Sequence, residues 1–257
     1  MHALSIICSL VLAGYVVIES ARSPARYREL KREIDSGDTG ARTSFYYEIL
    51  WFEWISAGLA FAALGFAWSN FNPSRLGLAA SSFGSWWSSV MAHANSGFVY
   101  GAGMGILIGV VVLFVALRLA RHRAAKSPTP PRRSRILPDF GYLLPASGRE
   151  RLLFGLVAIS AGVCEEVVFR AWLLVTLHGF ARLDGWVLVL AGSVVFGLAH
   201  YYQGVIGVLV TAALGLAFCG LYVGAGTLLL PIAAHALIDL RWAVFPSLPG
   251  FSPQPPS

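Results

Sequence analysis

Long apolar runs constrain the fold of this chain more than any other feature of its sequence. Each run has the roughly 17 to 25 residues that a helix needs to cross a bilayer. We find seven of them, at residues 3–20, 46–69, 98–119, 152–177, 186–202, 204–223 and 227–246. Only helices and closed barrels satisfy their backbone polar groups in lipid, and these runs lack the alternation of barrel strands. The sequence therefore predicts an all-α, polytopic membrane helix bundle with about seven transmembrane helices.

Composition and charge placement agree with a membrane location. Of the 257 residues, 56% are hydrophobic and only 12% are charged, as expected where lipid is the main solvent. The net charge of +6 does not indicate nucleic-acid binding, because six basic residues lie between Arg22 and Arg42 and nine between Arg118 and Arg151. Two such basic loops are expected to face the cytoplasm beside anionic lipid.

The same rule predicts the topology of the whole chain. Seven spans place the N-terminus outside and the C-terminus in the cytoplasm, in a bacterial-type inner membrane. The loop at 70–97 is then expected on the outer side, with Trp86 and Trp87 as interface anchors.

A basic segment with three prolines divides the chain. We expect a three-helix membrane region at 1–120, a cytoplasmic loop at 121–136, a second membrane region at 137–246 and a flexible tail at 247–257. We find no ionisable group near the centres of the first three spans. The second region holds the candidate functional residues, which are Glu165, Glu166, Arg170, His200, His235 and Asp239.

Local patterns in the second region predict how its helices pack. The short connection "YYQG" at 201–204 forces an antiparallel hairpin, and Gly207, Thr211 and Gly215 form a small-residue stripe that a neighbouring helix can approach. Pro231 removes a backbone donor, so the last span is expected to bend one turn before His235.

Ionisable side chains inside an apolar span need partners, because a charge at mid-bilayer costs about 2.5 to 3.5 kcal/mol on insertion scales. Glu166 and Arg170 lie four residues apart, so they can pair on one helix face. Glu165 points about 100° away and must face another partner. His200 and the pair His235 and Asp239 lie in two other spans.

These residues could form one polar pocket from three helices. Glu165 and His200 would deprotonate a water, while a second histidine with an acid or amide would stabilise the oxyanion, which is the chemistry of peptide hydrolysis. The alternatives are a structural ion pair, a hydrogen-bonded core histidine and a histidine merely oriented by Asp239. Six ionisable residues in three apolar spans exceed what packing requires, so we favour a functional site.

The order and spacing of these residues are similar to those of a known family. The segments "EEVVFR" at 165–170, "FGLAH" at 196–200 and "HALID" at 235–239 resemble the EExxxR, FxxxH and HxxxN or HxxxD motifs of the CAAX-protease and bacteriocin-processing (CPBP) family, also called type II CAAX prenyl endopeptidases. Motifs of zinc HExxH, serine GxSG and aspartyl GxGD intramembrane proteases are absent from the sequence. The resemblance covers roughly residues 137–246.

The resemblance implies an intramembrane endopeptidase with a cavity open to the cytoplasm and a membrane-associated protein or peptide as substrate. It implies that Glu165 and His200 activate water and that Glu166 and Arg170 support them. His235 and Asp239 match the pair proposed for the oxyanion site. Prenyl-protein members carry Asn at the last position, and an ionised Asp cannot donate to an oxyanion. Asp239 therefore either orients His235 or stays protonated.

The sequence is consistent with more than one cofactor requirement and more than one function. Glu165, His200 and His235 could bind zinc, but a metal-free mechanism explains the same residues and is favoured slightly, because Arg170 already occupies one carboxylate and no zinc spacing is present. A proton-coupled transporter or a non-catalytic membrane immunity or scaffold protein would also use buried ionisable groups.

Overall fold

The computed structural model describes residues 2–67 and 140–244, and within these ranges every regular element is helical. The expected span at 98–119, the loop with Trp86 and Trp87, the basic loop at 121–136 and the tail at 247–257 lie outside the described residues. The long elements are α1 (His2–Asp35), α2 (Ala41–Ala67), α5 (Gly148–Glu166), α6 (Leu173–Ala181), α7 (Gly185–Ala199), α8 (Gly204–Ala225) and α9 (Leu229–Val244). The predicted all-α helical bundle is confirmed.

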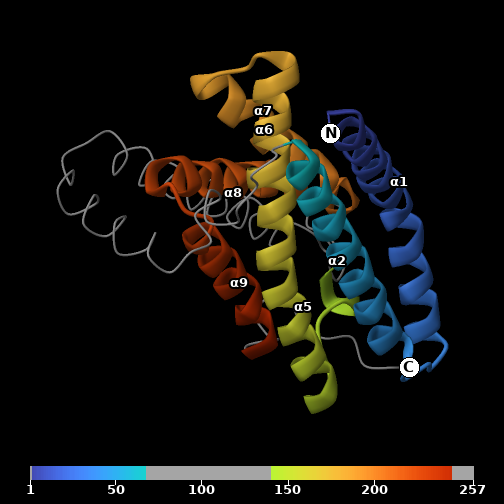
Figure 1. Cartoon of the computed structure of the whole chain (residues 1–257). Coiled ribbons are helices and arrows are strands. Elements are labelled where there is room, and N and C mark those ends of the chain that lie inside the picture. Colours follow the sequence, from blue (N-terminus) through green and yellow to red (C-terminus); the bar gives the residue numbers. More distant parts are fainter. Residues whose placement is uncertain (1, 68–139, 245–257) are drawn as a thin grey trace, which may run out of the picture.

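Neighbouring helices in the bundle pair in a simple order. Figure 1 shows α1, α2, α5 and α9 side by side, with α8 running crosswise to them. The tightest pairs are α1 with α2, α5 with α9, and α7 with α8. This arrangement surrounds α5 with helices from both ends of the chain.

The helix that carries the first motif is longer than expected. α5, the π-helical segment η3 (Val167–Trp172) and α6 form one continuous helix from Gly148 to Ala181. It begins with a capping box, in which the Ser147 side chain accepts a hydrogen bond from the Glu150 backbone and Glu150 accepts one from the Ser147 backbone. This cap satisfies two backbone donors at the start of the helix.

Four of the described helical segments are long and apolar enough to cross a membrane: Ala3–Asp35, Ala41–Ala67, Gly148–Ala181 and Tyr201–Ala225. The most apolar window of the first is only 6% buried within the protein, and it exposes large side chains such as Leu10 and Val17. An uncovered apolar surface of this kind is stable in contact with lipid and not in water. The chain is an integral membrane protein.

The first basic loop is mostly helical, which differs from the prediction. α1 continues as one helix to Asp35, so Arg22 and Arg26 lie within it and only residues 36–40 connect it to α2. The apolar run ends near residue 20, but a helix can extend beyond the lipid, where water solvates its charged side chains. Arg22 and Arg26 both bond to Glu19 on the same helix.

Small residues set the distance between α7 and α8, as the stripe on α8 predicts. A Cβ on Gly197 would lie 2.7 Å from the Cβ of Ala212, and one on Gly215 would lie 3.0 Å from the Phe196 ring. The expected bend at Pro231 is wrong. α9 begins at Leu229, so Pro231 lies in its first turn, where the backbone N–H has no intrahelical partner to lose.

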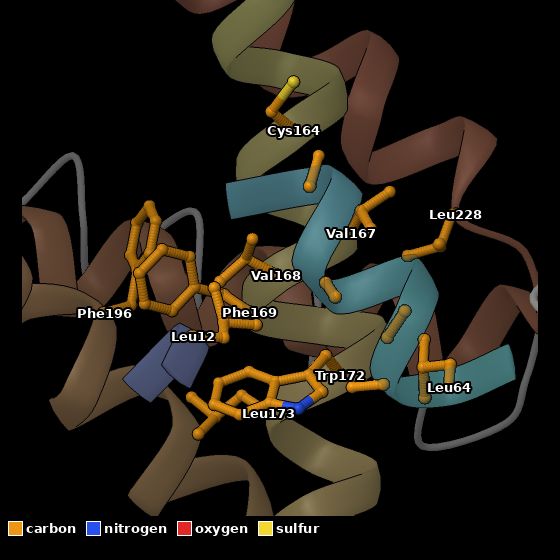
Figure 2. Close-up of a cluster of buried hydrophobic side chains, with 14 residues drawn as sticks. Leu12, Leu64, Cys164, Val167, Val168, Phe169, Trp172, Leu173, Phe196 and Leu228 are labelled. Atoms are coloured by element: carbon orange, nitrogen blue, oxygen red, sulfur yellow. The ribbon is translucent and has the colours of Figure 1, made fainter. Parts of the chain in front are cut away.

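The largest apolar cluster holds the π-helical segment in place. Figure 2 shows Val167, Val168, Phe169 and Trp172 packed with Leu12 of α1, Leu64 of α2 and Phe196 of α7. The Trp172 indole also donates to the Ser9 hydroxyl across 3.1 Å. Helices from both ends of the chain therefore fix the segment that carries Arg170.

Candidate active site

A buried ion pair occupies the junction of α5 and η3. Glu166 and Arg170 are 0% exposed, and Nη1 of Arg170 donates to Oε1 of Glu166 across 2.9 Å. The guanidinium also donates to the Gly215 carbonyl at 3.4 Å and lies over the rings of Phe196 at 4.3 Å and Phe218 at 5.2 Å. Hydrogen bonding and cation–π contact offset part of the cost of burial, while Nε of Arg170 and Oε2 of Glu166 have no hydrogen-bond partner among the described residues.

The π-helical turn contributes to this placement. A π-helical segment is wider than an α-helix and occurs frequently at functional sites. Here all of its residues are buried, and it begins immediately after Glu166. It therefore carries Arg170 within a packed turn rather than on the lipid-facing surface.

His235 of α9 is anchored to the same ion pair. Its Nδ1 lies 2.8 Å from Oε1 of Glu166, and its ring stacks on Phe218 with centroids 5.0 Å apart. Because the Glu166 carboxylate also accepts from Arg170, it must accept the hydrogen bond, so Nδ1 carries a proton. The other nitrogen, Nε2, is 3.8 Å from Oε2 of Glu165 and 3.5 Å from Oδ2 of Asp239.

Glu165 lies between the two histidines. Its Oε2 is 3.7 Å from Nε2 of His200 and 3.8 Å from Nε2 of His235, and it has no hydrogen-bond partner among the described residues. His200 ends α7, and its Nδ1 lies 2.9 Å from the Phe196 carbonyl, which can only accept. The separations from Glu165 exceed hydrogen-bond length and suit groups that share a water.

A cavity of about 160 Å³ adjoins Glu165 and His200. It lies among α1, α2, α5 and η3, with apolar side chains such as Val168 and Phe169 in its wall. One water needs roughly 10 to 15 Å³ of such volume. The space next to Glu165 can therefore hold several waters or part of a peptide.

The three side chains considered as zinc ligands are not arranged as a ready-made metal centre in the described part of the chain. Within residues 2–67 and 140–244, no group of three or more His, Cys, Asp or Glu side chains is placed to hold a metal ion. Glu165, His200 and His235 nevertheless come together, with Oε2 of Glu165 3.7 Å from Nε2 of His200 and 3.8 Å from Nε2 of His235.

The site includes an acidic residue that the sequence reasoning missed. The statement that the first three spans have no central ionisable group is wrong, because Glu53 lies near the middle of α2 and is only 4% exposed. It lines the same cavity as Glu165. The signal was available, since an ionisable side chain inside an apolar run is the feature that first drew attention to Glu165. Phe218 gave no such signal, because an aromatic residue in an apolar helix is ordinary.

Comparison with protein families matches this part of the chain to a known group. The family model described as "Type II CAAX prenyl endopeptidase Rce1-like" matches residues 148–241, which include all six candidate residues. This region is similar to that family, which supports the family that the motifs indicated. The protein is thus a CAAX-type intramembrane protease in general terms, as the sequence motifs predict. No curated protein and no solved structure matches the chain.

Proposed function

We propose that the protein is an endopeptidase that hydrolyses a peptide bond of a membrane-associated protein or peptide, near the cytoplasmic side, through a water activated by Glu165 and His200. The observation that carries this proposal is the position of one carboxylate oxygen of Glu165. It lies within 3.8 Å of two imidazole nitrogens from different helices, beside a cavity large enough for water.

The proposed reaction uses Glu165 twice. Its carboxylate removes a proton from a water that also hydrogen-bonds to Nε2 of His200, and the oxygen attacks the carbonyl carbon. The negative charge on the carbonyl oxygen is stabilised by a proton on Nε2 of His235. When the C–N bond breaks, Glu165 returns its proton to the leaving nitrogen, so one peptide and one water give an acid and an amine.

Glu166 and Arg170 have a positioning role in this proposal. Glu166 accepts from Nδ1 of His235, so the ring is held with Nε2 toward Glu165. Asp239 lies 3.5 Å from the same Nε2. We propose that its charge favours the protonated form of His235 and that it does not donate to the oxyanion itself.

The distribution of basic residues supports the proposed orientation. In Figure 1, α1 ends, α2 and α5 begin and α9 ends at the lower end of the bundle. The basic residues near that end are Arg28, Lys31, Arg32, Arg42, Arg149, Arg151 and Arg241. By the positive-inside rule this end faces the cytoplasm, which places the N-terminus outside. With Ser36→Cys, a membrane-impermeant maleimide should label only permeabilised cells; labelling of intact cells would reverse the assignment.

A cleavage experiment with isotopically labelled water tests the reaction. Membrane proteins from cells that lack this protein are incubated with the reconstituted full-length chain in H₂¹⁸O, and new C-termini are identified by mass spectrometry. We expect ¹⁸O in the new carboxyl groups with the wild-type chain and at least about 10²-fold slower incorporation with Glu165→Ala or His200→Ala. Normal cleavage by both variants contradicts the mechanism, and the uncut precursors identify the substrate.

A further inference from the structure

The wall of the cavity contains unpartnered oxygens beyond Glu165. Oε2 of Glu53 and the hydroxyl of Ser56 have no hydrogen-bond partner among the described residues, although the two residues are only 4% and 3% exposed. They lie three positions apart on α2, so they share a helix face, and both line the cavity. Although Ser160 hydrogen-bonds to the Glu53 carboxyl, two buried oxygens without partners are costly, which indicates a site built for a ligand.

Charge in the cavity favours a cation as that ligand. Four carboxyl side chains line it, from Glu19, Glu48, Glu53 and Glu165. Arg26, the arginine that the described residues contribute to the wall, already pairs with Glu19 and Glu48. Burial and repulsion by the Glu165 carboxyl make an ionised Glu53 costly, and a cation beside Glu53 would offset that cost.

The rest of the lining defines the shape of the group that would fit. Apolar side chains cover much of the wall, including Ile49, Phe52 and Leu143. A lysine side chain combines a flexible aliphatic stem with three donors at its end, and the stem can lie on apolar surface while the ammonium bonds to oxygens. Glu53 and Ser56 supply such oxygens on the same helix as Ile49 and Phe52.

We propose that Glu53 and Ser56 form a subsite for a basic side chain of the substrate, lysine in particular, close to the peptide bond that Glu165 attacks. The position of this bond rests on the proposed function, whereas binding of the basic group does not require that cleavage occurs. The subsite gives α2 a part in substrate selection, although α2 lies outside the region matched to the protease family.

Binding and cleavage are measured separately to test the subsite. For binding, the full-length chain carrying Glu165→Gln is reconstituted in nanodiscs, so that peptides remain uncut. The probes are acyl-anchored Leu/Ala peptides in which one lysine is moved along the sequence, each paired with a peptide that has norleucine at the same position. Norleucine keeps an unbranched aliphatic stem and lacks the amine, so the ratio of the two dissociation constants reports the ammonium.

We expect the lysine peptide to bind about 10-fold to 100-fold more tightly at one or two positions, which is the range for a hydrogen bond to a charged group. Adding Glu53→Gln should reduce this preference to less than about threefold, since the neutral amide keeps the shape but not the charge. Glu33→Gln is the matched control, because Glu33 is exposed on α1 and does not line the cavity. It should retain the preference.

Several results would overturn the subsite. One is that the protein carrying only Glu165→Gln binds lysine and norleucine peptides equally at every peptide position. This comparison stands even if Glu53→Gln does not fold. A second is equal weakening of lysine and norleucine peptides by Glu53→Gln, which would indicate a structural role. In the active chain, loss of cleavage for both peptides with unchanged binding would assign Glu53 to proton transfer instead.

The two measurements also separate this inference from the proposed function. A lysine preference in binding without cleavage of any peptide supports the subsite and contradicts the endopeptidase mechanism. Cleavage of both peptides without a preference supports the mechanism and overturns the subsite. In the active chain we expect Glu53→Gln to lower kcat/KM for the lysine peptide and to leave that for the norleucine peptide unchanged.

Discussion

Glu165 and Glu166 are consecutive residues with opposite surroundings. Glu166 is 0% exposed, and its Oε1 accepts from both Arg170 and His235. Glu165 is 22% exposed, and its Oε2 faces two imidazoles without a hydrogen bond, beside the cavity. One carboxylate is fixed by charged donors, and the other is available to bind a proton.

The difference follows from the geometry of a single helix. Successive residues rotate by about 100°, so neighbours face different elements of the bundle. On one side, Arg170 and His235 bond to Glu166, and both lie against the ring of Phe218. On the other, α1 and α2 leave a cavity. The proposed reaction needs both carboxylates, because the base Glu165 must exchange protons while Glu166, which holds the His235 ring, must not move.

The largest expected effect on the cleavage rate comes from neutralising Glu165, the carboxylate beside the cavity. Glu165→Gln should lower kcat by about 10²-fold to 10⁴-fold, the usual contribution of a general base, with little change in thermal stability. Initial rates of peptide cleavage and a melting curve measure the two quantities. Glu33→Gln, on the exposed part of α1, is the matched control and should keep full activity. A large decrease in the melting temperature of Glu165→Gln would show that Glu165, like Glu166, holds the fold together.

Removing the guanidinium of Arg170 from beside Glu166 should instead destabilise the fold. Arg170→Met leaves Glu166 buried without its charged partner, and breaking a buried pair in this way costs about 3–5 kcal/mol. The free energy of unfolding in mild detergent, measured with denaturant, reports the loss.

A double variant shows whether the charge itself is responsible. Glu166→Gln with Arg170→Met removes both charges, so it should be more stable than Arg170→Met alone. If both variants lose the same free energy of unfolding, packing of the guanidinium, and not the ion pair, stabilises the surroundings of Glu166.

His200→Ala should have a smaller effect than Glu165→Gln, because it removes the second contact to the water and leaves the base. We expect about a 10²-fold decrease in kcat with KM nearly unchanged. His178→Ala provides the control, since His178 is exposed at the end of α6 and pairs with Asp184 away from the site. A decrease confined to KM would assign His200 to substrate binding.

Asp239→Asn tests whether the charge of Asp239 keeps the His235 ring protonated. The amide keeps the shape but removes the charge 3.5 Å from Nε2, so the protonated form of the ring becomes less favourable. We expect a decrease in kcat of about tenfold or less. An increase would show that a donor at this position serves the oxyanion better than the acid does.

The smallest expected effect is that of metal removal. Dialysis against a strong chelator should leave the cleavage rate unchanged, because the proposed reaction uses only side chains and water. Loss of activity that returns with added zinc would show that a zinc ion binds beside Glu165 in the active protein.

Most of the fold was predictable because lipid imposes a length on each apolar helix. The same criterion gave the wrong end for α1, since a helix such as α1 can continue to Asp35 in water, beyond the apolar run. It also gave a bend at Pro231, because sequence does not show that α9 begins only two residues earlier. The six candidate residues came from motifs and spacing, whereas Glu53 was overlooked in a span that carried no motif.

The sequence by itself determined that the chain crosses a membrane, and that acids, an arginine and imidazoles lie on its helices at spacings that allow pairing along one helix. Tertiary structure alone decided which of two adjacent glutamates is fixed and which faces a cavity. The physical reason is that periodicity sets directions around one helix axis, but the partners in those directions come from α1, α2, α7, α8 and α9, which pack there only in the folded bundle.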